Sequence, residues 1–300
     1  MLSRIGDYAQ NSLATQLLLD AQTRTRETQV QISTGKKATR FRELAGDANR
    51  LVSAKDALQR IQKFQTNNLL VGGRLDVMES STASLVDIAT RLRTLLIQRL
   101  DSAQGVPGII TADAQNLLQQ ALSDLNVELD GRHLFAGSRT DTTPVVLDPA
   151  YSAFGSADTT YYQGDAVQLS ARADVDIDFT YGVTADRQGF QELIGALRTT
   201  IEGDGSDDRT MLSSALDLLN SALPKITDYR SEIGARHAAL DRINDGHADA
   251  EVYLQRQVSD IEDVDLTEAI SRLTRDQAVV ESSLATIAQL SQVSLVDFLR

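Results

Sequence analysis

The feature that most constrains this chain of 300 residues is an apolar repeat with alternating steps of four and three, present in both halves. Side chains at this spacing fall on one face of a helix and match a coiled-coil seam. The pattern therefore predicts long helices, each of which needs a partner helix. The two longest seams comprise Val71, Leu75, Met78, Thr82, Leu85, Ala89, Leu92 and Leu96, then Leu212, Leu216, Leu219, Leu223, Ile226, Arg230, Ile233, His237 and Leu240.

Between residues 137 and 184 the helical pattern gives way to β-formers and turn residues. The stretch from Val175 to Tyr181 alternates strictly, which is typical of a strand with one apolar and one wet face. Shorter strands are expected at residues 159–162 and 167–171. The sequence thus predicts a mainly α fold, an elongated antiparallel helical bundle or coiled-coil rod formed by the N- and C-terminal halves, with a small β-rich insert at its tip.

Local signals place the ends of several helices. A helix is expected at residues 111–134, after a break marked by glycine and proline at 105–108. Pro224 lies inside the second long seam and predicts a kink or a boundary there. Asp265 and Glu268 have the spacing of a capping box, which predicts a helix start after a break between Ile261 and Leu266.

These signals divide the chain into three parts. Residues 1–44 and 264–300 are predicted to be terminal assembly helices. Residues 45–136 and 185–263 are predicted to form the helical rod, and residues 137–184 the β-rich outer insert.

The two ends carry a thin apolar stripe that gains little from packing on a single neighbour. Residues 20–29, for example, contain only Ala21 as an apolar residue. Isolated helices are marginal in water, so we expect both ends to become ordered only against other chains. The alternative is a pair of ordinary surface helices on a bundle. The predicted assembly interface comprises Leu13, Leu17, Leu266, Ile270, Leu273, Leu284, Ile287, Leu295 and Phe298.

Composition argues against several classes of function. A net charge of -13 disfavours binding to nucleic acid, and no apolar run is long enough for membrane insertion. The N-terminus lacks the apolar core of a standard secretory signal. The chain has no cysteine, its three histidines lack metal-ligand spacing, and no catalytic motif occurs. We therefore expect no catalytic residue, metal or cofactor, and no enzyme activity.

Several motifs match a known family. The segments QISTGK at 31–36, GARH at 234–237, SDIEDVDLTEA at 259–269 and SLVDFL at 294–299 resemble the N- and C-terminal helical regions of bacterial flagellins. The middle segments GRHLFAGS at 131–138 and TDTTP at 140–144 are similar to those of hook-associated members of this superfamily, found at the hook–filament junction.

The resemblance implies an extracellular flagellar subunit that leaves the cell through the flagellar type III system without a cleaved signal. Its terminal helices would be disordered in the free subunit and would form the inner tubes of the flagellum after assembly. It also implies contacts with hook-associated protein 1, with flagellin and with the chain itself, and an export chaperone before secretion. A filament flagellin and a non-flagellar coiled-coil binding module with fully folded ends are the alternatives.

Overall fold

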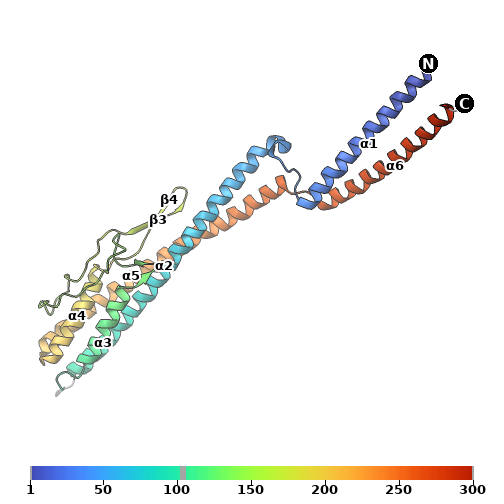
Figure 1. The fold of residues 1–300 in the computed structure, drawn as a ribbon. Helices are drawn as coiled ribbons and strands as arrows, with labels where there is room; N and C mark the ends of the chain where they lie inside the picture. The colour runs from blue at the N-terminus through green and yellow to red at the C-terminus, as the bar shows by residue number, and fades with distance from the viewer. Residues whose placement is uncertain (1, 102–105, 299–300) are drawn as a thin grey trace. The chain divides into compact units, whose positions relative to one another are not determined.

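The computed structural model describes residues 2–101 and 106–298 and is mainly helical (Figure 1). The expected antiparallel helical bundle with a small β-rich insert is confirmed. No helix in these residues is long and apolar enough to cross a membrane. In chain order the elements are α1 (Leu2–Thr34), the 3-10 helix η1 (Phe41–Asp47), α2 (Ala48–Asp101), α3 (Thr111–Leu125), β1 (Glu128–Leu129), β2 (Arg132–His133), β3 (Leu169–Asp174), β4 (Ile177–Tyr181), α4 (Gln188–Gly205), α5 (Arg209–Glu262) and α6 (Leu266–Phe298).

The chain forms two compact units, which we describe separately. The terminal unit comprises residues 1–60 and 250–300, and the central unit comprises residues 61–249. Both boundaries fall inside a long helix, because α2 and α5 each contribute to both units.

In the central unit α2 and α5 run antiparallel. Residue numbers fall along α5 as they rise along α2 at three successive contacts, which only an antiparallel pair allows. The contacts are Asn68 Nδ2 to Asn244 Oδ1 (2.9 Å), Asp76 Oδ1 to His237 Nε2 (3.0 Å) and Glu79 Oε1 to Arg230 Nη2 (3.4 Å).

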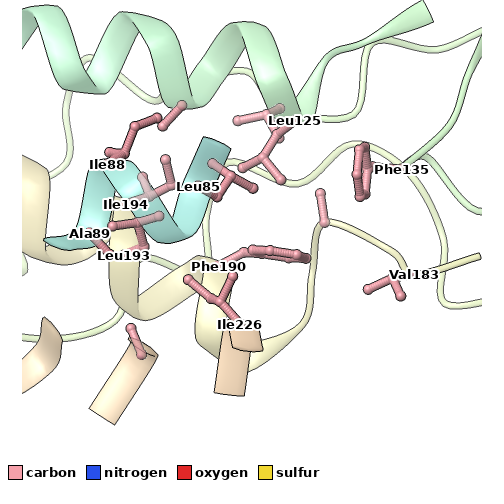
Figure 2. Packing of buried hydrophobic residues seen from close by; sticks show 14 of the residues in the cluster. Leu85, Ile88, Ala89, Leu125, Phe135, Val183, Phe190, Leu193, Ile194 and Ile226 are labelled. Carbon is pink, nitrogen blue, oxygen red and sulfur yellow. The ribbon is translucent and has the colours of Figure 1, made fainter. Parts of the chain in front are cut away.

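The predicted seams form the core of the central unit. All eight seam residues of α2 are buried, and on α5 the seam is buried at Leu212, Leu219, Ile226, Ile233 and Leu240. Helices α3 and α4 pack on each other and complete the cluster with residues such as Leu125 and Phe190. Figure 2 shows Leu85, Ile88 and Leu193 within this packing.

The insert contains one hairpin that is anchored to both long helices. Strands β3 and β4 pair antiparallel, and Ala173, Phe179 and Tyr181 are buried. The carbonyl oxygen of Ala173 lies 3.1 Å from Asn68 Nδ2 of α2 and 2.9 Å from His247 Nε2 of α5. The strand expected at residues 159–162 was wrong, since only an isolated bridge between Tyr162 and Val145 forms there.

The third helix is shorter than predicted. It ends at Leu125 and not at residue 134, because a tight turn follows. Asp130 and Gly131 have φ angles of 53° and 73°, which suit an Asp-Gly hairpin turn between β1 and β2. Helix α5, by contrast, continues through Pro224, so no boundary occurs there.

A buried ion pair joins three segments of the central unit. Asp204 at the end of α4 accepts a hydrogen bond from Arg99 Nε of α2 at 2.8 Å, and both side chains are buried. Its other carboxylate oxygen accepts from the backbone N–H of Ile110 (2.9 Å) and the hydroxyl of Thr111 (2.8 Å). Asp207, which is half-exposed, also pairs with Arg99.

Candidate assembly surface

The terminal unit contains the helix pair α1 and α6, which lie side by side (Figure 1). Among the residues of these two helices whose side chains are described, 12–34 and 266–289, the buried ones are small or polar, namely Ala21, Thr28 and Ala269. One ion pair also joins the helices, from Arg24 Nε to Asp276 Oδ1 at 3.7 Å. Small residues at the contact allow the two helices to approach closely, but they bury little apolar area.

Most of the predicted assembly residues point away from this contact. Leu13 is 58% exposed and Ile270 is 53% exposed, although both are large apolar side chains. Large apolar groups in water are costly by about 1.5–3 kcal/mol each relative to full burial. Leu17, Leu266 and Leu284 are exposed as well, while Leu273 and Ile287 are half-buried.

Two predicted residues cannot be placed in the same way. Leu295 and Phe298 belong to helix α6, but their side chains lie outside the described residues. Sequence reasoning also missed three exposed apolar residues of the same helix pair. These are Leu19, Val30 and Val279, and the thin stripe in which they lie gave little reason to single them out.

At the base of the helix pair a carboxylate is held by two lysines. Glu262, the last residue of α5, accepts from Lys36 Nζ at 2.5 Å and from Lys55 Nζ at 2.6 Å. These hydrogen bonds hold the pKa of the Glu262 carboxyl below its ordinary value. We call Lys36, Lys55 and Glu262 the clamp.

Backbone hydrogen bonds next to the clamp join the segment after α1 to the segment before α6. Lys37 N donates to the carbonyl oxygen of Glu262 at 2.7 Å, and Val264 N donates to that of Gly35 at 2.9 Å. Gly35 has a φ of +71°, a conformation that favours glycine. The connections after α1 and before α6 therefore form one short antiparallel bridge.

The clamp could not be predicted from the sequence, although Glu262 lies in a segment rich in acidic residues. The partners lie more than two hundred residues away along the chain, so no local pattern reveals them. The predicted start of α6 is confirmed, because Asp265 Oδ1 accepts from the backbone N–H groups of Thr267 (2.8 Å) and Glu268 (3.1 Å).

The histidines serve packing and surface pairing in this structure. His247 is buried and stacks on Phe64 with ring centroids 5.8 Å apart. His237 pairs with Asp76 and Asp241 at the surface, and His133 Nδ1 lies 3.0 Å from the carbonyl oxygen of Asn126. Among the described residues no group of three His, Cys, Asp or Glu side chains is arranged to hold a metal ion.

Comparison with known proteins places this arrangement in a family. Two family models match the chain: the bacterial flagellin N-terminal helical region over residues 5–140 and the bacterial flagellin C-terminal helical region over residues 216–299. The first contains most of α1 and all of α2 and α3, and the second contains most of α5 and all of α6.

Individual relatives are more distant. The chain is 25% identical to flagellar hook-associated protein 3 of Escherichia coli over 205 residues, which is 62% of this chain and 64% of that protein. It is 21% identical to the protein of that name from Salmonella typhimurium over 290 residues, 88% of this chain and 90% of that one.

A solved structure shares the fold. The structure of a putative flagellar hook-associated protein from Vibrio parahaemolyticus aligns with a TM-score of 0.58 and 15% identity, over 72% of this chain and 97% of that one. Because the N- and C-terminal helical regions of flagellin together match most of its length, the chain belongs to the bacterial flagellin superfamily, a family of structural flagellar proteins.

Proposed function

We propose that this protein is a structural subunit of the bacterial flagellum at the hook–filament junction, and that it assembles by coupled folding of its terminal helices. One observation carries the proposal. Helices α1 and α6 meet through small residues and turn their large apolar residues outward, as in Leu13, Leu17 and Leu284. Hook-associated protein 3 of two bacteria among the relatives supports the junction as the position.

The energetics favour assembly over a stable isolated pair. Ordering a residue costs roughly 1–2 kcal/mol in backbone entropy, and a contact through Ala21 and Ala269 offsets little of that. Burying an exposed leucine against a neighbour contributes about 1.5–3 kcal/mol. Neighbouring subunits thus supply the apolar contacts that the free helices lack, and folding is coupled to docking.

The clamp gives this coupling a fixed starting point. Lys36 lies just after the end of α1 and Glu262 lies just before the start of α6, so their ion pair holds the end of α1 beside the start of α6. A neighbouring subunit then meets two aligned helices, which reduces the ordering cost of docking.

The proposed partners are hook-associated protein 1 on one side of the junction, flagellin on the other, and further copies of this chain. We also propose export through the flagellar type III system, with a chaperone bound before secretion. The role is structural and not catalytic.

Substitution in helix α6 tests the proposal. Leu284→Asp and Ile287→Asp place a charge in the predicted interface, and Gln289→Asp, at an exposed polar position, is the matched control. We expect the first two variants to be missing from isolated flagella, with thermal unfolding of the central unit unchanged. Normal filament growth by cells that carry either variant as their sole copy would contradict the proposal.

A filament flagellin is the second candidate, because the matching family models are those of flagellin itself. A filament protein polymerises alone into long filaments, whereas a junction protein adds only a thin layer. Electron microscopy of the purified protein at high concentration distinguishes them. A non-flagellar coiled-coil module is the third candidate and predicts that both ends of the monomer resist limited proteolysis.

A further inference from the structure

Three Asp-Gly pairs occur in this chain, and their aspartates are Asp130, Asp204 and Asp245. An aspartate followed by glycine is prone to rearrange its own backbone, because glycine has no Cβ to hinder its nitrogen. The structure places the three pairs in different environments: a tight turn, the end of α4 and the interior of α5. The chain therefore contains internal controls for a reaction that depends on local structure.

The rearrangement begins when the backbone nitrogen of the glycine attacks Cγ of the preceding aspartate. An N–Cγ bond forms, the amide proton is lost to solvent, and the carboxyl hydroxyl leaves as water, which gives a cyclic succinimide. Water then opens this ring at either carbonyl carbon. Opening at Cγ restores aspartate, whereas opening at the backbone carbonyl gives isoaspartate, in which the main chain runs through Cβ and Cγ. The water that is lost is regained, so neither the mass nor the oxidation state of the chain changes overall.

The reaction needs a backbone rotation that brings the glycine nitrogen to Cγ, so it is slow wherever the peptide is held. Asp204 is buried, and its carboxylate accepts the three hydrogen bonds described above. Asp245 lies inside α5, where the backbone hydrogen bonds of the helix fix each peptide group. Rotation at either site would break buried or helical hydrogen bonds.

Asp130 is held least of the three aspartates. Asp130 and Gly131 are exposed, and together they form the whole loop between β1 and β2. These strands have two residues each, and an isolated two-stranded pair is marginal in water. A segment with few buried contacts opens at low cost. Asp130 also has a φ of 53°, which is unfavourable for a residue with a side chain and is relieved when the turn opens.

We propose that Asp130 is a site of spontaneous isoaspartate formation in the folded protein, through attack of Gly131 N on Asp130 Cγ. The product carries an extra methylene in the main chain of the turn. This insertion breaks the pairing of Leu129 with Arg132, because the two-residue loop fixes that register. The inference is independent of the proposed function, since it follows from the chemistry and exposure of the turn.

Mass spectrometry of aged protein tests the proposal. The purified full chain is kept in warm, mildly acidic buffer, is shown to stay folded by circular dichroism, and is then digested with trypsin. The three pairs fall in separate peptides, residues 100–132, 199–209 and 243–256, so electron-transfer fragmentation assigns isoaspartate to each pair. We expect the isoaspartate fraction at Asp130 to exceed that at either other pair by about tenfold, which corresponds to a difference of about 1.4 kcal/mol in the free energy of local opening.

Two controls isolate the cause. Asp130→Glu keeps the charge but would have to form a larger ring, so it should remove the rearranged product from its peptide. Wild-type chain aged in urea should show similar isoaspartate fractions at all three pairs, because their surroundings no longer differ. Equal fractions in the folded chain, or a larger fraction at Asp204 or Asp245, would overturn the proposal. Isoaspartate that forms at Asp130 only after unfolding would overturn it as well.

Discussion

The buried Arg99–Asp204 pair gives the sharpest test of how the central unit is held together. Replacing Asp204 with Asn preserves shape but leaves a buried guanidinium facing a neutral amide. Breaking a fully buried ion pair costs about 3–5 kcal/mol. Asp207 still pairs with Arg99 in the variant, so we expect a smaller loss of unfolding free energy, about 2–4 kcal/mol.

This loss is large enough to measure by thermal unfolding. The central unit comprises residues 61–249, and a domain of this size loses roughly 2–4 °C of Tm for each kcal/mol. Circular dichroism should therefore show Tm lower by about 4–16 °C for Asp204→Asn. The control is Asp207→Asn, whose side chain is 52% exposed and whose loss should stay below about 1 kcal/mol. Equal melting of the two variants would refute the reasoning.

The pH dependence of the same pair has a definite sign. Burial alone raises the pKa of Asp204, but the hydrogen bonds from Arg99, Thr111 and Ile110 outweigh it and lower the pKa below its ordinary value of 3.8. The stabilisation is therefore complete above that pH and is lost as the pH falls below it. Asp204→Asn should remove this part of the acid sensitivity, and a difference between variant and wild type that persists unchanged at low pH would contradict it.

Four further substitutions test other features. Glu262→Gln should weaken the clamp by about 1 kcal/mol and speed amide exchange at Lys37 in the assembled protein about fivefold. Because hydrogen bonds lower the pKa of Glu262, the wild-type protein should show the same faster exchange as the pH falls below 4.5. His247→Ala should destabilise the central unit by about 1–3 kcal/mol, measured by urea unfolding, whereas His237→Ala at the surface should cost under about 1 kcal/mol. Gly131→Ala should cost about 1 kcal/mol through its positive φ, and an unchanged midpoint would show that the turn relaxes.

The helical part of the fold could be predicted because burial follows a simple period. Leu75, Leu85 and Leu92 lie on one stripe of α2, and the same stripe is buried in the structure. The end of α3 could not be found in this way, because an apolar period at Leu129 continues past the true end at Leu125. There the Asp-Gly turn sets the backbone conformation, and the apolar periodicity carries no signal of that turn.

Contacts between distant segments were beyond the reach of local patterns. The burial of His247 depends on the register of α2 against α5 and on the hairpin whose carbonyl it meets at Ala173. Glu262 of α5 likewise contacts Lys55 of α2 only because these two helices run antiparallel. By contrast, the exposure of Leu13 and Leu284 followed from the sequence, since a thin stripe on each helix has too few partners within the chain.

The terminal unit is built from two pieces of sequence, residues 1–60 and 250–300, whereas the central unit is continuous. This difference sets an order of events during maturation. A chain that emerges gradually, from a ribosome or from a narrow pore, can complete its middle as soon as that stretch is free. Its first segment must wait for the last one, and joining them across an unfolded middle would cost roughly 5 kcal/mol in loop entropy. A folded central unit therefore lowers the entropy cost of pairing the two end segments, and these segments are the last to fold.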